Sequence, residues 1–199
     1  NNVNGIANNS EIGVVEGKNS ITLTNSNVTG YKDNGFMLYQ SFSGNAENGI
    51  ARLKAENNTL TTHATGAFLY VNNTTAEVDL SNNAISMPNT STLVKAAADS
   101  RLGKTGENGG HLTLRTSNQE LSGNIMADSI STIALDMTNG SSLVGAVNTD
   151  NTAKEVTVKL SKDSNWTLTG DSYVKSLNNE DTTGSNIHLN GYKLVVAEK

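Results

Sequence analysis

The chain has 199 residues and a formal net charge of −5, with 35% hydrophobic residues, one proline and no cysteine. The absence of cysteine excludes disulfides, thiolate nucleophiles and cysteine-ligated metals. The acidic balance, with only 14 scattered Lys and Arg, argues against nucleic-acid binding. No stretch approaches the ~20 apolar residues of a membrane-spanning helix. We therefore expect no nucleic-acid partner and no transmembrane segment.

A short outline recurs along the chain, in which an apolar-polar-apolar strand is followed by a corner rich in asparagine. It is clearest in residues 49–66, GIARLKAENNTLTTHATG. Its recurrence every ~20 to 35 residues is typical of solenoid folds. We predict that one leucine per repeat forms an inward column: Leu23, Leu53, Leu80, Leu114, Leu135, Leu160 and Leu189.

Two further apolar positions per repeat indicate a second and a third side. After the corner, the second column is predicted to hold Val28, Leu60, Ile85, Leu121, Leu143, Trp166 and Leu194. The third column is predicted to hold Val15, Met37, Phe68 and Leu93. Short strands joined by polar corners predict an all-β fold, a right-handed parallel β-helix of about seven coils. The alternative is an antiparallel β-sandwich, because six Asn-Gly dipeptides are strong hairpin signals.

The domain organisation follows from the uninterrupted repeat. We expect a single β-helix domain over residues 1–199, cut from a longer surface protein whose missing neighbours would adjoin residues 1–10 and 192–197. Two segments break the period: Ala96–Gly110, in which Lys95–Ser100 could form a short helix, and Asn148–Lys154. Insertions in solenoids emerge on one face and often carry binding.

The last third of the chain contains the most specific sequence motifs. WTLTGDSYVKSL, from Trp166 to Leu177, is followed by NIHLNGYKLVV from Asn186. These phrases resemble those near the end of bacterial autotransporter passenger domains and related surface adhesins. The resemblance implies a right-handed β-helix displayed on, or released from, a bacterial surface. It does not imply an enzyme, because the nucleophilic-serine motif of autotransporter proteases is absent.

Candidate chemistry is sparse. No G-x-S-x-G, H-E-x-x-H, P-loop or dinucleotide motif is present, and His63, His111 and His188 lack metal-ligand spacing. We therefore predict no catalytic residues, no metal and no cofactor. Outward charges are interpreted as ion pairs between neighbouring coils, joining Arg52 to Asp79 and Arg115 to Asp136. Because β-helix lyases and glycosidases place such residues on one face, a carbohydrate-active enzyme is the alternative.

The candidate binding residues lie on the third side and in the first insertion. They are Tyr39, Tyr70, Lys95, Arg101 and Lys104. Tyr39 and Tyr70 share one alignment position and are expected to stack, with Lys95 next in the column. On the opposite parity, Leu38, Leu69 and Val94 also align, so we expect this outer face to be covered by the 96–110 insertion or by another chain.

These features together predict a non-enzymatic bacterial surface or secreted protein of the adhesin or passenger type. Its loops would bind a host or bacterial glycan or protein, in cell adhesion or virulence. We expect an extracellular or outer membrane-associated location, and self-association through the coil edges or the Leu38, Leu69 and Val94 face. A passive spacer is the third interpretation.

Overall fold

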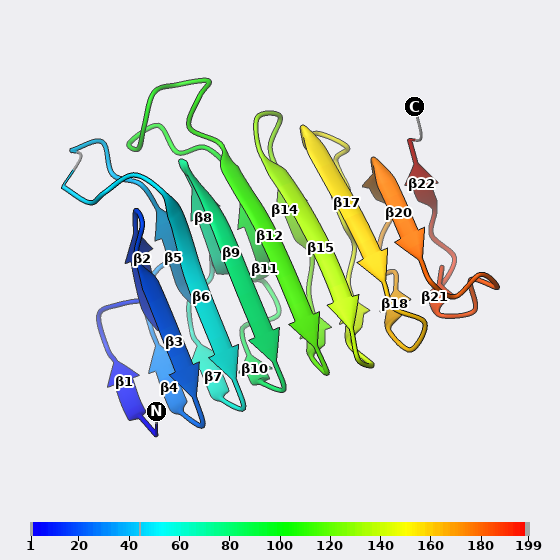
Figure 1. Ribbon diagram of the computed structural model, residues 1–199, viewed down its shortest axis with the longest axis horizontal. Helices are drawn as coiled ribbons and strands as arrows, with labels where there is room; N and C mark the ends of the chain where they lie inside the picture. The colour runs from blue at the N-terminus through cyan, green and yellow to red at the C-terminus, as the bar shows by residue number, and fades with distance from the viewer. Residues whose placement is uncertain (1, 44, 198–199) are drawn as a thin grey trace.

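A computed structural model describes residues 2–43 and 45–197. Within these residues every element is a β-strand, and all of the strand pairs are parallel. The chain runs down one face, passes behind and returns upward while it advances from the N-terminal to the C-terminal end (Figure 1), which is a right-handed turn. The predicted parallel β-helix is confirmed, and the β-sandwich alternative is wrong.

The coil has three sides. One side is a continuous seven-stranded sheet, called here the long sheet, which faces the viewer in Figure 1 and confirms the predicted seven coils. Its strands are β3 (Ser20–Thr24), β6 (Ile50–Glu56), β9 (Thr74–Ser81), β12 (Gly110–Ser117), β15 (Thr132–Thr138), β17 (Glu155–Leu160) and β20 (Ser176–Asn179).

The other two sides, called here the second and third walls, are each interrupted. The second wall consists of two separate four-stranded sheets: β1 (Asn4–Ala7), β4 (Asn27–Gly30), β7 (Thr59–Thr62) and β10 (Ala84–Ser86), then β13 (Glu120–Ser122), β16 (Ser142–Val144), β18 (Asn165–Thr167) and β21 (Ile187–His188). The third wall contains β2 (Gly13–Glu16), β5 (Phe36–Tyr39), β8 (Ala67–Asn72), β11 (Thr92–Ala96) and β14 (Ile125–Ala127), then the pair β19 (Ser172–Val174) and β22 (Leu194–Val196).

The inward columns of the long sheet correct the predicted register. The predicted leucine column divides into two neighbouring columns that are two residues apart along each strand. The first runs Ile21, Leu53, Val78, Leu114, Leu135, Val158 and Leu177, and the second runs Leu23, Ala55, Leu80, Thr116, Met137, Leu160 and Asn179. Leu189 lies outside this sheet and is 48% exposed, so its assignment was wrong.

The second-wall column is confirmed from Val28 through Ile85 and from Leu121 through Trp166. Ile187 follows Trp166 in this column, whereas Leu194 pairs with Ser172 in the third wall. Trp166 is fully buried, and its Nε1 donates a hydrogen bond of 3.0 Å to the Gly145 carbonyl oxygen.

Asparagines turn the chain between the long sheet and the second wall. Asn25, Asn57, Asn82, Asn118 and Asn139 all have φ near +50°, in the left-handed region that asparagine tolerates well. The residue after each turn forms an inner ladder of hydrogen bonds. Asn58 N–H donates to Asn83 Oδ1 at 3.1 Å, and Asn83 N–H donates to Gln119 Oε1 at 2.9 Å. The asparagine-rich corners predicted from the sequence therefore turn the chain and link neighbouring coils.

The outer face of the long sheet carries charges of alternating sign in one column. The column is Lys54, Asp79, Arg115, Asp136 and Lys159. The strand register places Arg115 between Asp79 and Asp136, with its Nη1 3.3 Å from Asp79 Oδ1. Arg52 faces Glu77 at 3.3 Å rather than Asp79, because the true register differs from the predicted one by two residues. Exposed pairs of this kind each contribute ~0.2–1 kcal/mol.

Candidate binding loop and side-wall cleft

Residues 97–109, called here the covering loop, fold back over the outside of the third wall. Ala97 N–H donates to the Val71 carbonyl at 3.1 Å, and Asn72 Nδ2 donates to the Ala97 carbonyl at 2.6 Å. Ala67, Tyr70 and Ala97 form a small buried cluster against Met37. The loop therefore covers the outer side of the third wall at Tyr70 and Met37. Lys95 and Ala96 belong to β11, so the short helix expected over 95–100 does not form.

Side chains inside the covering loop fix its shape. Asn108 Nδ2 donates to the carbonyl oxygens of Asp99 at 2.8 Å and Leu102 at 2.6 Å. Arg101 binds both carboxylate oxygens of Asp99, at 3.0 and 2.7 Å. The hydrogen bonds from Arg101 lower the pKa of Asp99 to about 2, so this pair is charged at neutral pH. These contacts within the loop restrict its conformation.

The structure brings three of the five candidate residues together. Lys95 Nζ lies 5.6 Å from the centre of the Tyr70 ring, which is a cation–π contact. The guanidinium of Arg101 also interacts electrostatically with the Tyr70 hydroxyl. Burial raises the pKa of the Tyr70 hydroxyl, which donates to the Ala97 carbonyl at 3.4 Å. Lys104 lies further along the loop, where it pairs with Glu107.

Tyr39 does not stack on Tyr70, contrary to the prediction. The register pairs Tyr39 with Glu16 and Asn72, and pairs Tyr70 with Met37 and Lys95. Burial and the nearby Glu16 carboxylate raise the pKa of Tyr39, whose hydroxyl donates to Glu16 at 3.4 Å. The predicted third column is also displaced, because Phe68 lies level with Leu93 while Met37 lies level with Tyr70.

Leu38, Leu69 and Val94 do not form an outer face. They are 0%, 1% and 1% exposed and belong to the central core. The prediction placed Met37 in an inward column, whereas Met37 packs with Tyr70 in the outer cluster and the neighbouring Leu38 and Leu69 belong to the core. Self-association through this face is therefore excluded by burial.

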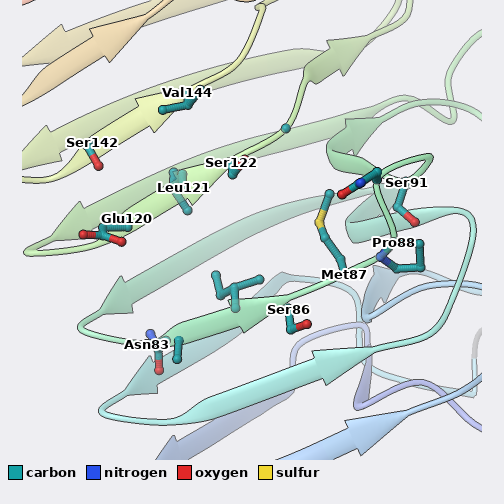
Figure 2. A pocket seen from close by; sticks show the side chains of 14 residues that line it. Asn83, Ser86, Met87, Pro88, Ser91, Glu120, Leu121, Ser122, Ser142 and Val144 are labelled. Carbon is teal, nitrogen blue, oxygen red and sulfur yellow. The ribbon is translucent and has the colours of Figure 1, made fainter.

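A second feature, which the sequence did not reveal, is a cleft of about 940 Å³ in the second wall. It lies where β10 and β13 fail to pair, and we call it the β10–β13 cleft (Figure 2). Its volume falls within the range of ligand clefts. Its lining residues are Asn83, Ala84, Ile85, Ser86, Met87, Pro88, Asn89, Ser91, Glu120, Leu121, Ser122, Gly123, Ser142 and Val144.

No family model, curated protein or solved structure matches this chain. The autotransporter resemblance therefore stays a prediction. Among residues 2–43 and 45–197, no cluster of three or more His, Asp or Glu side chains could hold a metal ion. The same residues include no helix that is long and apolar enough to cross a bilayer.

Proposed function

We propose that the protein is a non-enzymatic, bacterial cell-surface or secreted β-helix of the adhesin or passenger type. Its rigid coils hold the covering loop outward to bind a host or bacterial glycan or protein. The observation that carries this proposal is the loop itself, which is fastened at its base while the side chains of Arg101 and Lys104 remain 83% and 74% exposed. A loop that is ordered in advance spends less conformational entropy on binding.

The charge of the loop favours an acidic ligand. Residues 95–109 contain three basic and two acidic side chains, whereas the whole chain has a net charge of −5. Carboxylated or sulfated glycans match this local excess, and the N–H groups of Arg101 that Asp99 does not occupy can donate to a ligand carboxylate. Lys95 over the Tyr70 ring extends the basic surface to the base of the loop.

A glycan array with the purified protein tests the proposal. The double variant Arg101→Ala/Lys104→Ala should lose at least tenfold in binding to acidic glycans. The matched control is Lys162→Ala/Lys193→Ala, which removes two exposed positive charges elsewhere on the surface and should bind like the wild type. If the double variant of the loop binds acidic glycans as tightly as the control variant does, the covering loop is not the binding site. If the wild type binds neither glycan nor protein ligands, a passive spacer is favoured.

A reducing-sugar assay on the same polysaccharides, run in parallel, tests the enzymatic alternative. The outward charges that motivated it lie in the ion-paired column of the long sheet, with Arg115 between Asp79 and Asp136. Sugar release that disappears in Asp79→Ala, Arg115→Ala or Asp136→Ala would establish a carbohydrate-active enzyme. Binding without release supports the adhesin proposal.

A further inference from the structure

The β10–β13 cleft arises because two stacked coils differ in length. The coils meet at Asn83 and Gln119 on one side and pair again at Val94 and Ile125 on the other. Eleven positions separate Asn83 from Val94, but only six separate Gln119 from Ile125. The longer coil cannot follow the shorter one along this wall, so the two strands separate between these fixed points.

The edge of β10 that borders the cleft has unpaired backbone groups. In a parallel sheet, the N–H and C=O groups of successive residues point to opposite neighbouring strands. Ala84 N–H donates to the Asn58 carbonyl at 2.8 Å, which directs the ladder bonds of Ala84 toward β7. Ile85 therefore directs its N–H and C=O away from β7, where no described strand pairs with β10.

The edge of β13 on the other side of the cleft also directs backbone N–H and C=O groups toward β10. Ser142 N–H donates to the Gln119 carbonyl, and Gly123 N–H donates to the Val144 carbonyl, both at 2.9 Å. Gln119 and Gly123 therefore direct their backbone groups toward β16. The residues one position away, Glu120 and Ser122, direct their N–H and C=O groups toward β10. The Glu120 carbonyl accepts a hydrogen bond of 2.8 Å from the side chain of Gln119. The N–H and C=O of Ser122 have no partner strand among the described residues.

Gln119 shows how such an edge is satisfied. Its side-chain amide accepts from Asn83 N–H and donates to the Asn83 carbonyl, at 2.9 Å each, as a paired backbone would. This amide closes one end of the cleft. At the other end the methyl group of Met87 lies against Gly123, where a Cβ atom would be only 3.0 Å from it. Methionine is flexible, so this end can open.

We propose that the β10–β13 cleft binds an extended peptide segment of a partner protein, which adds as a strand between β10 and β13. Its backbone would pair with Ile85 on one side and Ser122 on the other, and this mode of recognition uses main-chain hydrogen bonds for affinity. Three residues, Glu120 to Ser122, lie between the two closed ends, so the paired part of the segment is about three residues long.

Side chains in the cleft define the preferred peptide. Figure 2 shows Glu120, Leu121 and Ser122 on one strand and Asn83 and Ser86 on the facing segment. Glu120 is the one charged residue of the lining, and it is exposed. A basic residue opposite Glu120 would complete an ion pair. The segment is therefore expected to be extended, rich in β-branched residues and to carry one Lys or Arg.

An array of random nine-residue peptides tests this inference on the full chain. Wild-type protein should enrich basic, β-branched sequences. Ser122→Pro removes the N–H that faces the cleft without removing a ladder hydrogen bond, because proline is tolerated at such edges. It should reduce binding at least tenfold. The matched variant Ser122→Ala also loses the hydroxyl but keeps the backbone donor, so it should bind more tightly than Ser122→Pro. Glu120→Lys should shift the selection toward acidic peptides.

A second measurement does not depend on the folding of a variant. The best peptide is remade with N-methyl groups on alternate backbone nitrogens, which removes the hydrogen bonds of one edge at a time. Each methylated series should lose at least tenfold in affinity for the wild type. No enriched peptide, or binding that survives both Ser122→Pro and methylation, would overturn the inference. Because the array contains no glycan, its outcome is independent of the covering-loop proposal.

Discussion

Replacement of Gln119 by alanine is expected to weaken the contact between the two coils that border the cleft. Gln119 is fully buried, and its side chain makes four hydrogen bonds: three to Asn83, at 2.9, 3.0 and 2.9 Å, and one to the Glu120 carbonyl at 2.8 Å. At ~1 kcal/mol net for each hydrogen bond, Gln119→Ala should lower the free energy of unfolding by about 3–4 kcal/mol.

Gln119→Asn keeps the side-chain amide but shortens the side chain by one methylene group, so it tests the length of the side chain alone. Asparagine occupies the corresponding positions of the two preceding coils, at Asn58 and Asn83. If the spacing at this corner requires the longer side chain, the shorter amide should still cost about 2 kcal/mol because it cannot reach both groups of Asn83.

Urea unfolding followed by far-ultraviolet circular dichroism measures both changes. The control is Asn178→Ala, which removes an exposed amide on the outer face of the long sheet and should change stability by less than ~0.5 kcal/mol. Since stability in a solenoid depends on contacts between neighbouring coils, the transition of Gln119→Ala should also broaden. A loss below ~1 kcal/mol with an unchanged transition would refute the assigned role of Gln119.

Three further predictions concern the core, the corners and the covering loop. Trp166→Phe keeps most of the buried ring but leaves the Gly145 carbonyl without its donor, and should cost about 1–3 kcal/mol in a thermal or urea unfolding experiment. Asn57 has φ +57°, so Asn57→Ala should lower the free energy of unfolding by about 1 kcal/mol and Asn57→Gly by less. Equal melting temperatures of the two variants would contradict this. The pKa of Asp99, about 2 in the folded protein, lies below its ordinary 3.8, so its contribution to stability is present above pH ~4 and is lost as the pH falls toward 2. Arg101→Ala should raise that pKa toward 3.8 in a carbon-13 NMR titration, and an unchanged titration would disprove the role of the guanidinium.

The inward and outward faces of the long-sheet strands were predictable, whereas their stacking register was not. Alternation has a period of two, so a shift of two residues leaves every side chain on the same face. Leu53 and Leu80 therefore share the inward parity of the long sheet but occupy neighbouring columns. On the third wall the alternation itself is interrupted, because the consecutive residues Phe68 and Leu69 both lie in the core. The predicted column therefore joined Phe68 to Met37, although Met37 is level with Tyr70 and packs with it outside the core.

The covering loop was partly predictable, because the insertion at 96–110 interrupts the period and contains Arg101 and Lys104. The β10–β13 cleft depends instead on a difference in length between two coils, and no single residue encodes such a difference. Two local signals accompany it. Pro88, the one proline of the chain, follows β10 and lacks a ladder donor, and glutamine replaces asparagine at position 119.

The alternating charges on the long sheet restrict how this molecule can grow or shrink. Loss of the coil that carries Arg115 would bring Asp79 against Asp136, and loss of the next coil would bring Arg115 against Lys159. Like charges directly opposite on adjacent strands are destabilising. Removal of both coils would instead place Asp79 beside Lys159 and restore the alternation. The outer face therefore favours duplication or deletion of coils in pairs, although each coil alone is the unit of the fold.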